Sequence, residues 1–309
     1  MTRAPAVAVA LIAWSIALHA TGQVLLKKTF IATYRNRVTI TTNFKVDEAH
    51  PHPNAIGTSS DDGDLHMAGR AQAIGLPMVV ELSNGRLNDV TGVENAIHAA
   101  QGTNQAVSVS GAWRLWMEHK SAEPMHQGDT VPVPENTNPK HVFEIHPITA
   151  FHGTATLETF APLRDDQKPT AHYQASDAET AFKRYEKMKL TVDRTDAVFV
   201  SIDGPQTPYN YVEFRLEVAG QATFVDDGAF VFANAFDLND VQLTTDPRRI
   251  VLVKDSRPAA LIGPAPVGQR FRVLGIPRIN LDAVMRFAKP NQVTVVTGAY
   301  ELIILAVIE

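Results

Sequence analysis

Hydrophobic positions along most of the chain recur with a period of two, which is typical of half-buried β-strands. In the first half this pattern predicts five strands, at residues 30–40, 64–68, 77–82, 106–119 and 141–151. Between the third and fourth of them, residues 89–101 place Val93, Ile97 and Ala100 at helical spacing. Five strands with one helix between the third and the fourth is the order of an OB-like five-stranded barrel.

The second half predicts another β-rich domain, with two short helices. Strands are expected at residues 197–202, 209–218, 228–236, 249–254 and 270–276, and two more within 292–308. Ser176 and Glu179 form a capping box for a helix that runs to about residue 190, and Asn280 caps a helix at 281–288. We find no internal repeat at a fixed period. The fold class expected from the sequence is therefore mainly β, an OB-like barrel followed by a second β-rich domain.

The N-terminus departs from this pattern. A charge-free apolar run follows Arg3, and Ala20-Thr21-Gly22 offers small residues before Gln23, as in a secretory signal that is cleaved there. Residues 4–26 are also long enough for a retained membrane anchor, which Lys27 and Lys28 would follow. We expect residues 1–28 to be a signal peptide or anchor, 29–153 the OB-like domain and 154–309 the second domain. Both interpretations place the protein outside the cytoplasm, on the periplasmic or extracellular side, with membrane contact through residues 4–26 in the second. A third interpretation makes the segment a buried core helix of a cytosolic protein.

Composition excludes several classes of function. The chain has no cysteine, so disulfides, iron–sulfur clusters, thiolate zinc sites and cysteine nucleophiles are ruled out. The formal net charge is −5, so the chain lacks the excess of positive charge that is typical of a general nucleic-acid binder. The chain contains no G-x-S-x-G, phosphate-binding loop or H-E-x-x-H motif. No catalytic residue is assigned.

One polar constellation stands out in the first domain. Strand alternation predicts that six polar side chains share one sheet face: Asp64, His66, Glu81, Arg114, Glu144 and His146. Carboxylates and imidazoles on one face suit a divalent metal, and Asp64, His66, Glu144 and His146 are its candidate ligands. Glu81 and Arg114 are candidate contacts for a ligand or partner. The alternative is an ordinary polar outer face, in which Arg114 pairs with Glu81 or Glu144.

Trp116 lies on the polar side by the same alternation, opposite Trp113, Leu115 and Met117. An aromatic side chain there is a candidate contact for a ligand or a protein partner. Alternatively, the loop at residues 121–140 or the second domain covers it. The first interpretation predicts a small cost of removing the indole, whereas Trp113, in the core, should be costly to remove.

The motifs D-G-D-L-H, V-V-E, W-R-x-W-x-E-H and E-I-H-P resemble a group of exported bacterial proteins of unknown function. The resemblance continues weakly through V-L-G-I-P-R-I-N-L and the strand at residues 300–303. It implies an OB-like first domain and export, and it brings no activity. The function expected is that of an exported, non-catalytic binding or scaffold protein of the cell envelope, an accessory subunit with a protein partner there. The alternative is a metal-dependent hydrolase that uses the polar face.

Overall fold

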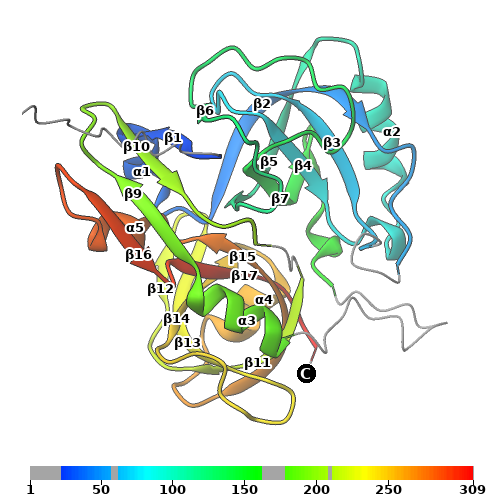
Figure 1. The fold of residues 1–309 in the computed structure, drawn as a ribbon. Helices are drawn as coiled ribbons and strands as arrows, with labels where there is room; N and C mark the ends of the chain where they lie inside the picture. Colours follow the sequence, from blue (N-terminus) through cyan, green and yellow to red (C-terminus); the bar gives the residue numbers. More distant parts are fainter. Residues whose placement is uncertain (1–21, 57–61, 162–177, 208–210, 309) are drawn as a thin grey trace, which may run out of the picture.

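The computed structural model describes residues 22–56, 62–161, 178–207 and 211–308. The protein is mainly β, as predicted, and its core consists of two closed five-stranded barrels packed against each other (Figure 1). A smaller sheet lies beside them. Among the described residues, the helices are too short to cross a membrane.

The first barrel has the strand order of an OB fold. Its strands are β2 (Thr39–Ala49), β3 (Leu65–Arg70), β4 (Met78–Leu82), β5 (Ala106–Leu115) and β7 (Phe143–Phe151). They close in the order β2-β3-β4-β7-β5-β2, and only the β4–β7 pair is parallel. Helix α2 (Thr91–Ala100) lies between the third and fourth strands and buries Val93, Ile97 and Ala100. The OB-like prediction is confirmed. The short β8 (Thr154–Ala155) pairs with β7 and precedes a 3₁₀ turn, η2 (Leu157–Thr159); another, η1 (Gly85–Leu87), follows β4.

The second barrel repeats this topology. Its strands are β11 (Val212–Val218), β13 (Gly228–Phe236), β14 (Arg248–Val253), β15 (Arg270–Ile279) and β17 (Tyr300–Val307). They close in the order β11-β13-β14-β17-β15-β11, again with one parallel pair, β14–β17. Helix α4 (Arg257–Ile262) occupies the place of α2, and β12 (Thr223–Val225) forms a hairpin with β13. The chain therefore holds one architecture twice.

A glycine marks the same place in both barrels. Gly111 on β5 and Gly275 on β15 lie at shifts of register against the last strand of their barrels. A Cβ at Gly111 would lie 2.4 Å from the carbonyl oxygen of Pro147, so no side chain fits there. The close approach of the neighbouring strand therefore accounts for the glycine at position 111.

The smaller sheet joins distant parts of the chain. Its order is β16 (Val293–Thr297), β9 (Lys189–Asp193), β10 (Phe199–Asp203), β1 (Val24–Lys27) and β6 (Met125–His126). Val24 and Leu26 are buried, so the end of the expected signal or anchor segment is a strand within the body of the protein. The rest of that segment, and the cap at Ser176, lie outside the described residues. Helices α3 (Ala178–Lys187) and α5 (Leu281–Phe287) complete the fold, the latter capped by Asn280 as predicted.

Two predictions about local structure were wrong. Residues 30–40 are not one strand, because α1 (Lys28–Tyr34) precedes β2. The rings of Phe30 and Tyr34 lie 4.6 Å apart, one helical turn from each other, and Phe30 also packs on Phe143. Such short apolar runs fit either period, and tertiary packing decides between them.

The second half also contains a third helix, α4, beyond the two expected. The Ser256 side chain accepts a hydrogen bond from the Ala259 amide, and Pro258 occupies the first turn. Serine followed by an early proline is a helix start that the sequence displays.

Candidate functional site

The polar side chains singled out from the sequence do lie together in the first barrel. His66 on β3 is paired with Glu81 on β4, and Arg114 on β5 with Glu144 on β7. Asp64 enters β3 beside them, and His146 follows Glu144 on β7. Alternation therefore assigned these residues to the correct side of their strands.

The face they form is not exposed to solvent, contrary to the expectation of an ordinary outer sheet face. Asp64, Arg114 and His146 are fully buried, and Glu81 and Glu144 nearly so. The second barrel covers them. The Tyr211 hydroxyl donates a hydrogen bond to Asp64, and the Pro277 carbonyl accepts one from Arg114. We call this contact region between the two barrels the seam.

Two arginine–glutamate pairs form the centre of the seam. Arg114 Nη1 donates to Glu144 Oε2 at 2.5 Å, and Arg278 Nε donates to Glu301 Oε1 at 2.6 Å. Arg114 also donates to the carbonyl of Pro277, the residue before Arg278, at 2.9 Å. In return, Arg278 donates to the carbonyl of Trp113, the residue before Arg114, at 2.9 Å. The barrels thus exchange equivalent hydrogen bonds, as the halves of a two-fold dimer would.

Burial and the neighbouring charges shift the pKa values of Arg278 and Glu144 in these pairs. Burial lowers the pKa of Arg278 to about 10, although Glu301 opposes the shift. For Glu144, burial alone would raise the pKa, but Arg114 and the neighbouring histidines hold it well below its ordinary value. Glu144 is therefore the counter-charge of Arg114, and it also lies 3.1 Å from His141 Nε2.

Trp116 is covered by the second half of the chain, so it is not an exposed contact for a ligand or partner. Its indole is 1% exposed, and its Nε1 donates to the carbonyl of Thr207 at 2.8 Å. The ring lies edge-on against Tyr185 of α3 at 5.5 Å. Trp113 is buried as predicted, with the Arg278 guanidinium 3.6 Å from its ring centroid.

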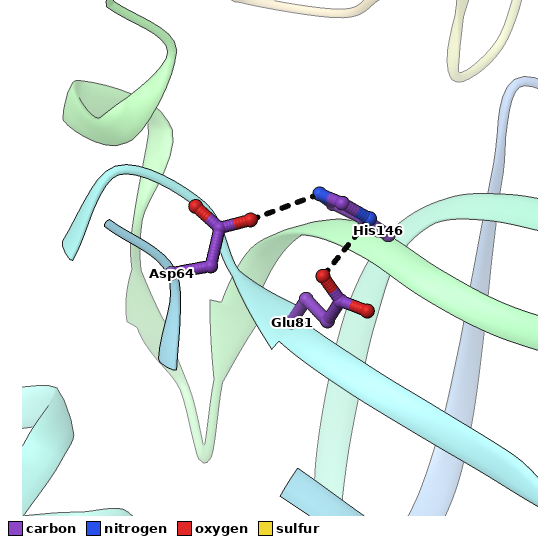
Figure 2. A group of neighbouring side chains, drawn as sticks. All are labelled: Asp64, Glu81 and His146. Atoms are coloured by element: carbon purple, nitrogen blue, oxygen red, sulfur yellow. Dashed lines mark ion pairs between the residues drawn. The ribbon is translucent and has the colours of Figure 1, made fainter. Parts of the chain in front are cut away.

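His146 lies between two carboxylates in the first barrel (Figure 2). Its Nε2 is 3.2 Å from Asp64 Oδ2, and its Nδ1 is 3.1 Å from Glu81 Oε2. Burial alone would lower the pKa of His146, but Glu81, Asp64 and Glu144 raise it to about 10. One ligand atom from each of Asp64, Glu81 and His146 lies within 4.8 Å of the other two. We call these three residues the acid–histidine cluster.

Tyr211 connects the cluster to the second barrel. Its hydroxyl donates to Asp64 Oδ2 and accepts from His146 Nε2, which lies 2.8 Å away. Burial and the charge of Asp64 raise its pKa well above the ordinary value, so it stays a hydrogen-bond donor. The main chain secures the other oxygen of Asp64, which accepts from the Asn84 amide at 2.7 Å.

His66 lies beside the cluster, towards the surface. Its Nε2 is 3.5 Å from Glu81 Oε2 and 4.0 Å from Asp62 Oδ2. Burial, and then the charge of Asp64, raise the pKa of Asp62 to about 7, since the region holds more carboxylates than cations. His66 also stacks on His50 at 4.9 Å.

Sequence reasoning missed Tyr211, Arg278 and Glu301. A signal for the arginine and glutamate was present, because G-A-W-R-L at residues 111–115 matches G-I-P-R-I at 275–279. Likewise F-E-I at 143–145 matches Y-E-L at 300–302. Nothing in the sequence pattern marks Tyr211, which directly precedes the first strand of the second barrel.

The chain matches no known family model, and no curated protein matches it significantly. The assignment of function therefore rests on the geometry of the chain itself.

Proposed function

We propose that this is an exported, non-catalytic binding or scaffold protein of the cell envelope, whose two barrels act as one rigid body. One observation carries the proposal: the polar face that the sequence nominates for chemistry is sealed in the seam. A substrate would have to reach Asp64, Glu81 or His146, and all three are buried beneath the second barrel. Metal-dependent hydrolysis, the alternative function, requires an open position for substrate.

The start of the described chain is compatible with a tether. Strand β1 lies between β10 and β6, and Gly22 donates its amide hydrogen to the Ala122 carbonyl at 3.0 Å. The described chain therefore begins at a point that the body of the protein holds in place. We propose that this segment exports the protein and then either is removed before Gln23 or holds the body at a membrane.

The surface proposed to contact a partner is a cavity of about 570 Å³ on the second barrel. Phe232 of β13 and Phe287 of α5 line it and are 47% and 61% exposed. Arg286 lies 6.0 Å from the Phe287 ring centroid, is largely exposed and pairs with Asp282 of the same helix at 2.5 Å. Arginine and aromatic side chains dominate the energetics of protein interfaces. The partner expected is a protein that presents apolar and acidic side chains.

The test compares two equally exposed side chains. Full-length protein carrying Phe287→Ser or Val267→Ser is used to capture partners from an envelope fraction; Val267 is 62% exposed and lies away from the cavity. We expect wild type and Val267→Ser to capture the same protein, and Phe287→Ser to lose it by at least about tenfold. Equal capture by all three would contradict the proposed surface.

The same preparations, supplied with Zn²⁺ or Mn²⁺, are assayed for hydrolysis of ester and phosphodiester substrates. We expect no hydrolysis above that of the free ions. Activity that Glu81→Gln abolishes would overturn the non-catalytic proposal in favour of the hydrolase.

A further inference from the structure

The seam holds an excess of buried negative charge. Asp62, Asp64 and Glu81 are each at most 5% exposed. Arg114 is committed to Glu144 and Glu118, and within the described ranges no lysine or arginine forms an ion pair with the other three carboxylates. Only His66 and His146 face them. Buried carboxylates are costly unless a cation compensates them.

Two buried atoms of the cluster also lack a hydrogen-bond partner. Glu81 Oε2 and His146 Nδ1 lie 3.1 Å apart, yet neither makes a hydrogen bond of acceptable geometry. His66 Nε2, which faces the same glutamate oxygen at 3.5 Å, is in the same state. Buried polar atoms in native proteins are nearly always satisfied, so three such atoms facing one another point to a missing ligand.

The second barrel provides an internal comparison. With Arg114 and Glu144 matched to Arg278 and Glu301 by register, the residue two positions further along the last strand is His146 in the first barrel. In the second barrel it is Ile303.

Glu81 has an apolar counterpart as well. In the first barrel Val80 pairs with Ile145, and Glu81 is the next residue on the strand. In the second barrel Ile250 pairs with Leu302 in the same way, and the next residue, the counterpart of Glu81, is Val251. The arginine–glutamate pair thus occurs in both barrels and the cluster in only one, so closing a barrel of this topology does not require the cluster.

We propose that Asp64, Glu81 and His146 bind one divalent transition-metal ion, with His66 beside it. Ligand atoms bonded at about 2.0–2.1 Å to a tetrahedral ion lie roughly 3.3 Å from one another. His146 Nδ1 lies 3.1 Å from Glu81 Oε2, close to that separation, and Asp64, Glu81 and His146 each offer one ligand atom within 4.8 Å of the other two.

Imidazole nitrogen with carboxylate oxygen, and no thiolate, suits Zn²⁺, Mn²⁺ or Fe²⁺. The imidazole ligand disfavours Ca²⁺ and Mg²⁺, which prefer sites made only of oxygen. This site goes beyond the proposed binding function and is independent of it. Because Tyr211 of the second barrel holds Asp64, the ion would also stabilise the seam.

Zinc is the probe for the test. Full-length protein is stripped with chelator, and its Zn²⁺ binding is measured by calorimetry and by metal analysis after dialysis, with Mg²⁺ as the competitor. The variants are Glu81→Gln, which keeps the shape of the side chain, and His146→Ile, which copies the second barrel. The matched control is His98→Gln, because His98 faces Glu94 on the surface of α2 at 3.9 Å.

We expect about one Zn²⁺ per wild-type chain, retained against excess Mg²⁺, and a melting temperature that rises with Zn²⁺. Glu81→Gln and His146→Ile should each weaken binding by at least about tenfold and abolish the rise, while His98→Gln behaves as wild type. Binding that survives Glu81→Gln, or that His98→Gln removes, would overturn the proposal. If His146→Ile fails to fold, Glu81→Gln decides the question alone.

Discussion

Removal of the Trp116 indole tests most sharply by mutation whether the second half of the chain covers this side of the first barrel. The ring is buried between β5 and the second half of the chain, and its Nε1 satisfies the carbonyl of Thr207. Truncation to alanine removes this packing, and large-to-small aromatic substitutions in a core cost about 3–5 kcal/mol. We therefore expect Trp116→Ala to destabilise the protein by an amount similar to Trp113→Ala.

A second variant separates the hydrogen bond from the packing. Trp116→Phe keeps most of the ring but leaves the Thr207 carbonyl without its donor, which should cost about 1–3 kcal/mol. The assay is urea unfolding of the full chain, comparing midpoints at constant slope. The control is Val267→Ala, which should stay within about 0.5 kcal/mol of wild type, because Val267 is largely exposed.

One result would refute the reasoning. If Trp116→Ala costs less than about 1 kcal/mol while Trp113→Ala costs about 3 or more, Trp116 is not buried by the second half of the chain. The polar face would then be open to solvent, and the first interpretation of Trp116, as an exposed contact for a ligand or partner, would hold.

Three further predictions concern the seam, His119 and the N-terminus. Glu301→Gln should cost about 3–5 kcal/mol, because it removes the counter-charge of the buried Arg278 and of Arg249. Replacing both Arg278 and Glu301 by apolar residues should recover part of this, and thermal unfolding of the wild type and the two variants decides. Burial, followed by the nearby His141, lowers the pKa of His119 from 6.5 to about 4. The unfolded chain therefore takes up this proton first, and about 3 kcal/mol of stability, present above pH 6.5, is lost as the pH falls towards 4. Unfolding measured between pH 7 and 4 should show a shallower loss in His119→Gln, and an unchanged profile would contradict the assignment. Native protein should be found outside the cytoplasm, with a mass starting near Gln23 or extracted only by detergent; full-length protein in the detergent-free cytosol would contradict export.

Strand alternation recovered much of the site because it depends only on local geometry. It put Glu81, Arg114 and His146 on one side of their strands, and the register of the barrel brings them together. It could not say what lies over that side. A polar face is expected to meet water, and here it meets a second barrel whose contacting residues are far away in the sequence.

The repeated barrel escaped sequence analysis for a similar reason. Arginine and glutamate are 30 residues apart in the sequence in the first pair and 23 in the second, because the segment before the last strand differs in length between the barrels. Insertions in surface loops cost little, so topology persists while the period is lost. The conserved order of strands became visible only through their pairing.

The central claim is that the second barrel seals the polar face of the first. Carbethoxylation of histidine by diethyl pyrocarbonate, mapped by mass spectrometry on the native chain, tests it directly. His146 is fully buried, whereas the side chain of His52 is 78% exposed, so both are read in one sample. We predict that His52 reacts readily while His146 reacts only after denaturation. Reaction of His146 in the native protein at a rate comparable to His52 would contradict the sealed seam.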